Sequence, residues 1–175
     1  MHTVSPSPYF DMERFLRTSG ESSLTDDDVA ECRFFLDRWH ALLVSKTIPA
    51  HEDDVLAIWL DESVEHAVDA AWQSSPSRGF RLHSLAQTIC MHAVNEHIPE
   101  IEQAGCAPVP FPDPALAQAL TEAGLPARVQ DNLVLARRYA VITPVLFKGQ
   151  CNSCALQTNC PNCRQLHRHF STHRI

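Results

Sequence analysis

Apolar residues recur three or four positions apart along most of the chain, which is the spacing of one face of an α-helix. Val29, Cys32, Leu36 and Trp39 show this spacing clearly. No run of useful length alternates between apolar and polar positions, as a half-buried strand would. We therefore expect an all-α fold, a single domain of about six helices joined by short turns. The predicted helical segments are residues 8–20, 23–49, 51–79, 80–105, 113–124 and 125–149.

Residues that begin and end helices support several of these boundaries. Thr25 can cap the second segment, and the three aspartates that follow it suit the positive end of a helix dipole. Asp113 and Pro114 are typical of a helix start, and Gly124 is typical of a helix end. Pro99 either kinks the fourth segment or starts a short extra turn.

Proline interrupts the helical pattern between the fourth and fifth segments. The run "CAPVPFPDP", residues 106–114, contains four prolines in nine residues. Such a run cannot be helical, because proline lacks the amide donor and clashes with the preceding turn. We expect a stiff connection that packs over the domain or forms a hinge.

Four cysteines lie within thirteen residues near the end of the chain, in "CNSCALQTNCPNC". A Cys-x2-Cys pair places two sulfurs on one side of a tight turn, and two such pairs would crowd four thiolates together unless a metal or disulfides held them. We expect a helical domain at 1–147 and a basic metal-binding tail at 148–175, packed on the last helix. The predicted ligands are Cys151, Cys154, Cys160 and Cys163.

Two metal centres compete for these ligands. A [4Fe–4S] cluster is favoured, because each cysteine binds a different iron and a compact loop can wrap it. Zinc (Zn2+) is the alternative, although the usual gap between paired motifs is longer than the one here. Disulfides are the remaining interpretation. The tail histidines could replace a cysteine as ligand: His167, His169 and His173.

The stretch "KGQCNSCALQTNC" resembles the cluster loop of endonuclease III-type DNA glycosylases, in which Cys-x2-Cys-x5-Cys also lies near the end of a helical protein. Cys151, Cys154 and Cys160 carry the resemblance, which implies an iron–sulfur cluster. The family's first cysteine falls at Pro144 here, and neither its glycine-rich helix-hairpin-helix motif nor its catalytic lysine and aspartate is present in context. The resemblance therefore supports a cluster and not base excision.

Charge is divided unevenly along the chain. The net charge is −7, but residues 1–147 carry −11 and residues 148–175 carry +4 without a single acid. An acidic body disfavours broad nucleic-acid binding, which needs a large positive surface. No apolar run approaches the ~20 residues that a membrane span requires, and the first residues do not form a signal peptide.

Seven cysteines without a secretion signal indicate a reducing compartment, so we expect a cytoplasmic protein. Cys32 and Cys90 fall within apolar helical pattern and are interpreted as small buried hydrophobic residues. Cys106 lies in the proline-rich run, and its role is left open.

Motifs for catalysis by side chains are missing. The chain has no phosphate-binding glycine loop, no nucleophile elbow and no His-Glu-x-x-His motif. Histidines and carboxylates on the third and fourth segments are interpreted as ordinary polar side chains on the outer face of a helix and not as a buried site. We therefore expect a non-enzymatic accessory protein with a mainly structural metal, whose partner is another protein. The alternatives are a redox-active iron–sulfur electron-transfer or sensor protein, and a structural-zinc or DNA-processing protein.

Overall fold

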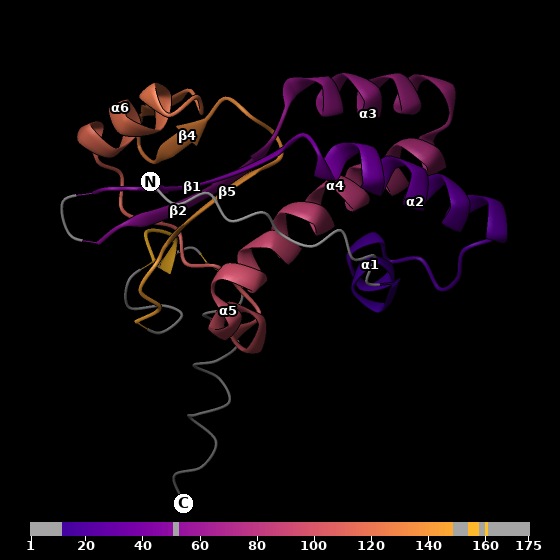
Figure 1. The fold of residues 1–175 in the computed structure, drawn as a ribbon, viewed down its shortest axis with the longest axis horizontal. Helices are drawn as coiled ribbons and strands as arrows, with labels where there is room; N and C mark the ends of the chain where they lie inside the picture. The colour runs from indigo at the N-terminus through magenta and orange to yellow at the C-terminus, as the bar shows by residue number, and fades with distance from the viewer. Residues whose placement is uncertain (1–11, 51–52, 149–153, 158–159, 161–175) are drawn as a thin grey trace, which may run out of the picture.

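The computed structural model describes residues 12–50, 53–148, 154–157 and 160 (Figure 1). Two helices come first in the described chain, followed by two strands, four helices and three strands. The elements are α1 (Met12–Ser19), α2 (Asp26–His40), β1 (Leu43–Ile48), β2 (Val55–Leu60), α3 (Glu62–Ser74), α4 (Pro76–His97), α5 (Pro99–Ala104), α6 (Pro114–Glu122), β3 (Ala127–Val129), β4 (Leu133–Leu135) and β5 (Ala140–Pro144).

The prediction of an all-α fold is wrong. The described residues form six helices and two antiparallel sheets, so the fold is mixed α/β. One sheet has the strand order β1-β2-β5, with Ser45 opposite Ile58 and Ala57 opposite Ile142. The other sheet is the β3–β4 hairpin.

Strand β2 is buried on both faces and lies at the centre of the fold. One alternate set of its side chains, with Ile58 in the middle, packs in a core with helices α1 to α5. The other set, Val55, Ala57 and Trp59, packs in a second core with α6. Figure 1 shows α6 and the β3–β4 hairpin on one side of the sheet, and α4 and α5 on the other. Three layers therefore result, with the sheet in the middle.

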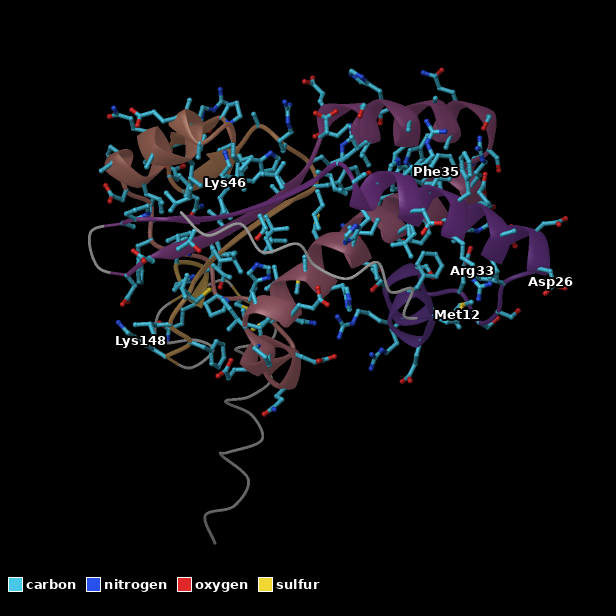
Figure 2. The ribbon with its side chains drawn as sticks, viewed as in Figure 1. Met12, Asp26, Arg33, Phe35, Lys46 and Lys148 are labelled. Carbon is cyan, nitrogen blue, oxygen red and sulfur yellow. The ribbon has the colours of Figure 1, made fainter. Side chains whose placement is uncertain are left out.

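Lys46 of β1 ties the sheet to the α6 layer. Its side chain lies on the α6 side of the sheet (Figure 2), where Nζ donates a hydrogen bond to the carbonyl of Ala123. The same ammonium lies 5.7 Å from the centre of the Trp59 ring. A cation near an aromatic face adds to the apolar packing in this second core.

Burial on both sides explains why β2 was predicted as helix. A strand covered on two faces is apolar at every position, so it shows no alternation and is indistinguishable from a buried helix by periodicity. The segment 51–79 therefore divides into β2 and α3, and the segment 23–49 divides into α2 and β1. In the described part of 125–149 the chain forms β3, β4 and β5 and no helix.

Several local predictions are confirmed. Thr25 and Asp28 form a reciprocal capping box at the start of α2, with both side-chain-to-amide distances at 3.2 Å. Asp113 caps α6 through the amide of Ala115. Pro99 starts the short helix α5, which ends at a glycine with φ +73°. None of the helices in the described ranges has the length and apolar run of a membrane span.

Deletion of a β2 side chain tests the double burial. Ile58 is fully buried in the first core, so Ile58→Ala leaves a cavity there, and we expect it to lower the free energy of unfolding by about 2–5 kcal/mol. Leu146→Ala is the matched control, because Leu146 is 60% exposed and surface changes stay within about 0.5 kcal/mol. Urea unfolding measures both. Equal stabilities of the two variants would contradict a fully buried β2.

Candidate metal centre

The predicted cysteine ligands lie partly within the described residues. Cys154 and Cys160 are described, and both are half-buried. The other predicted ligands lie outside the described residues: Cys151, Cys163, His167, His169 and His173. Among the described residues no group of three or more histidine, cysteine or acidic side chains could hold a metal. Those residues by themselves therefore contain neither an iron–sulfur nor a zinc site.

The cysteine run is docked on the proline-rich loop between α5 and α6. The backbone N–H of Val109 donates a hydrogen bond to Sγ of Cys154 at 3.4 Å. The carbonyl of Val109 accepts a hydrogen bond from the N–H of Ala155 at 2.9 Å. Both polar backbone groups of one residue thus bind two consecutive residues of the run, which fixes the position of the Cys154 sulfur relative to the body.

Proline gives this loop its extended form. A residue that precedes proline is confined to extended backbone, and this applies to Ala107, Val109 and Phe111 alike. Pro108 and Pro110 are buried, whereas the residue between them is half-buried. The loop thus packs Pro108 and Pro110 on the body, while the N–H of Val109 donates to Cys154 in the cysteine run. Of the two predicted arrangements, the burial of Pro108 and Pro110 supports a connection packed over the domain.

The three cysteines outside the run differ in their surroundings. Cys32 and Cys90 are buried in the first core, as predicted. Burial raises the pKa of each thiol to about 12, which keeps both protonated and unreactive at neutral pH. Cys106 is half-buried in the proline-rich loop, three residues before Val109.

The chain approaches the cysteine run directly from strand β5. After Pro144, the N–H of Val145 donates to the carbonyl of Asp54 at 2.8 Å, and Lys148 forms an ion pair with Asp53. Figure 2 shows Lys148 on the side of the molecule away from α2. The body therefore contacts the chain at residues 145–148 and, through Val109, at Cys154 and Ala155.

A polar cluster anchors the beginning of β5. The guanidinium of Arg138 binds both carboxylate oxygens of Asp69, at 2.6 and 3.2 Å. The backbone N–H of Arg138 donates to Glu65 at 2.9 Å, and Arg137 pairs with Glu62 at 3.1 Å. The acids of α3, interpreted from the sequence as ordinary polar side chains on the outer face of a helix, thus hold this segment against α3.

Tyr139 connects the same segment to the interior. Its carbonyl accepts the N–H of Leu60 at 3.0 Å, and its hydroxyl lies 3.0 Å from Nδ1 of His83. Burial lowers the pKa of His83, and the positive charge of Arg138 lowers it further. Burial also raises the pKa of Tyr139. His83 and Tyr139 therefore form a neutral pair at pH 7, which joins α4 to the residue just before β5.

Sequence reasoning missed both Val109 and Tyr139. Val109 acts through its backbone, and the signal for it is the Pro-Val-Pro pattern, which leaves one amide donor in an extended run. Tyr139 lies in a segment that was predicted to be helical. Its hydrogen bond with His83 depends on the strand β5 that follows it, and the sequence pattern did not predict that strand.

Exposed apolar side chains flank the run. Eight large hydrophobic side chains are exposed among the described residues, and half of them lie in the three segments that adjoin the cysteines. Isolated exposed apolar residues are normal, whereas several in adjoining segments are typical of contact surfaces. These four are Phe111, Val145, Leu146 and Leu156.

A scan against protein-family models, a search of curated proteins and a search of solved structures each found no match to this chain. The interpretation of the cysteine run therefore depends on this chain's own residues and contacts.

The His83–Tyr139 pair predicts a loss of stability in acid. The pKa of His83 is lowered in the folded protein, so the unfolded chain binds the proton more readily below pH about 6.5. The free energy of unfolding should fall as pH drops through this window, and it should level off once folded His83 is protonated.

Urea unfolding over a series of pH values checks this expectation. We expect His83→Gln to flatten the fall, because the glutamine has no proton to bind. His66→Gln, at an exposed histidine of α3, is the matched control and should keep the fall of the native chain. An equal fall in the native chain and His83→Gln would show that His83 does not cause it.

Proposed function

We propose that this chain is a metal-binding accessory protein whose four C-terminal cysteines hold an inorganic centre with a mainly structural role. The observation that carries the proposal is the hydrogen bond from the Val109 amide to Sγ of Cys154. Metal-bound thiolates commonly accept such bonds, and donors to the sulfur tune the centre. The proposed ligands are Cys151, Cys154, Cys160 and Cys163.

The spacing of the cysteines favours a [4Fe–4S] cluster. Five residues separate the two Cys-x2-Cys pairs, and a cluster tolerates a short gap because each sulfur binds a different iron. Zinc is the alternative occupant, with its four ligands around one ion. His167, His169 and His173 are the candidates to replace a cysteine.

A structural role follows from the composition of the tail. Residues 148–175 carry four cations, three histidines and few large apolar side chains, so burial alone contributes little to ordering them. Ligation of a structural metal supplies about 10–16 kcal/mol of binding free energy, which becomes folding free energy for the segment that provides the ligands. The contacts of Val109 with Cys154 and Ala155 support this role.

The exposed apolar side chains next to the run support a protein partner. Phe111 is 56% exposed and Leu146 is 60% exposed, and apolar surface of this kind contributes to protein–protein contacts when it is covered. We place the protein in the cytoplasm, where free thiols stay reduced and available to a metal.

Substitution of one cysteine tests the ligand assignment. Removing a ligand should weaken metal retention by more than the about 10–100-fold that loss of an outer hydrogen-bond partner causes. We therefore expect Cys154→Ser to lose most of its metal after anaerobic purification, and elemental analysis measures the metal per chain. Circular dichroism should show the body folded, because the two cores do not include Cys154.

Cys106→Ser is the matched control, since Cys106 is also half-buried but lies outside the four-cysteine run. It should keep the metal content of the native chain. Full metal occupancy in Cys154→Ser would contradict the assignment of Cys154 as a ligand. Loss of metal in Cys106→Ser alone would move the site to the proline-rich loop.

A further inference from the structure

We infer that the outer edge of β1 is a docking surface for a second copy of this chain, which pairs with it strand to strand. The inference goes beyond the proposed function and does not depend on the metal centre. β1 lies at one edge of the three-stranded sheet, because the strand order is β1-β2-β5. A strand at an edge has one row of backbone N–H and C=O groups that no neighbouring strand pairs, and such a row binds another extended strand.

Backbone hydrogen bonds at the end of β2 show which groups of β1 face outward. The N–H of Leu60 donates to the carbonyl of Tyr139, on the β5 side, whereas the N–H of Asp61 donates to the carbonyl of Leu42, on the β1 side. Successive residues of a strand point their backbone groups to opposite sides. With the observed register, alternate residues of β1 therefore bond to β2: Val44, Lys46 and Ile48. The residues between them point their N–H and C=O groups away from the sheet: Leu43, Ser45 and Thr47.

These outward groups are unpaired within the part of the chain that the structure describes, where no backbone hydrogen bond joins them to another residue. The opposite edge of the sheet is less complete. By the same alternation, Pro144 is an outward residue of β5, and proline has no N–H to offer. The edge of β1 thus has a donor and an acceptor at each outward position, unlike the edge of β5.

The charged side chain of β1 does not guard this edge. A lysine on an edge strand usually discourages pairing with another strand, and Lys46 is the charged residue of β1. Its ammonium is turned toward the α6 layer (Figure 2), where it donates to the carbonyl of Ala123 and lies 5.7 Å from the centre of the Trp59 ring. The outward backbone groups are therefore left open to a partner strand.

Two copies of β1 are self-complementary when they pair antiparallel about a two-fold axis at Ser45. Ser45 then lies opposite Ser45 of the second copy and Leu43 lies opposite Thr47, so every outward residue exchanges both hydrogen bonds with an outward residue. Lys46 lies opposite Val44, which keeps like charges apart. An axis at Lys46 would oppose the two lysines, and an axis at Val44 would leave Thr47 opposite a residue outside β1. This match of backbone and charge favours a second copy over an unrelated strand.

Pairing through one strand of each copy predicts a weak and reversible dimer. β1 has six residues, and pairing of one such strand covers less than the about 1,200–2,000 Å² that stable interfaces bury. The register also brings Leu42, which is 37% exposed, beside the end of β1 in the second copy. The net charge of −7 on each copy opposes association. We therefore expect association to increase with protein concentration, and with salt, which screens that repulsion.

Thr47→Pro removes one outward N–H, and Thr47→Val keeps it with a side chain of similar shape. Proline is tolerated in an edge strand where its nitrogen faces away from the neighbouring strand. We expect Thr47→Pro to weaken association by about 5- to 150-fold, because the two-fold axis removes two hydrogen bonds at once. Thr47→Val should match the native chain. Sedimentation equilibrium of the full chain measures both, with a reductant present so that cysteines do not link the copies, and circular dichroism checks folding.

Amide hydrogen exchange in the native full-length chain needs no variant and decides the matter if Thr47→Pro does not fold. The outward amides of β1 should exchange fast in dilute protein and more slowly as the protein concentration rises. The alternate amides, which bond to β2, should exchange slowly at every concentration and serve as the internal control.

Slower exchange of the outward amides at high concentration, together with weaker association of Thr47→Pro, would support the pairing. Equal association of Thr47→Pro and Thr47→Val would overturn it, as would outward amides that exchange fast in the associated protein or slowly in the dilute one. A chain that stays monomeric at every concentration would overturn the second copy as the occupant of this edge. None of these results depends on metal content, so the proposed function is tested separately.

Discussion

The fold depends on one strand that is buried on both faces. β2 presents alternate side chains to two separate cores, so each of its faces must be covered by helices to remove apolar surface from water. This requirement places α4 on one side of the sheet and α6 on the other. It also places β1 and β5 on its two edges, where they satisfy the backbone groups of β2. The burial of β2 between two cores therefore explains why helices cover both faces of the sheet.

The cysteine run acquires its position from this arrangement. β5 must pair with β2, and it therefore delivers the chain to residues 145–148, beside Asp53 and Asp54. The chain must also pass from the α5 layer to the α6 layer, and the proline-rich loop makes that crossing. Val109 in the loop and Cys154 in the run are 45 residues apart, yet they share a hydrogen bond. This contact is thus a consequence of two helical layers around one strand.

Local signals in the sequence predicted the helix ends well, because a cap is a contact between near neighbours. Thr25, Asp113 and Pro99 all act where they were expected. The strands could not be predicted this way, since the apolar run at 55–60 has no period that distinguishes it from helix. For the site, spacing indicates the cysteines, but the Val109 contact requires the crossing loop to be placed next to the run. No local pattern between residues 109 and 154 indicates that proximity, because it arises from the pairing of β5 with β2.

The central claim is that four sulfurs near the end of this chain hold an inorganic centre. The most direct measurement is elemental and sulfide analysis of the native full-length protein after anaerobic purification, together with its visible spectrum. The account predicts a coloured protein with about four iron atoms and matching sulfide per chain, or a colourless one with about one zinc ion. A folded native chain that contains neither, and whose cysteines in the run all react freely with a thiol reagent, would contradict the account.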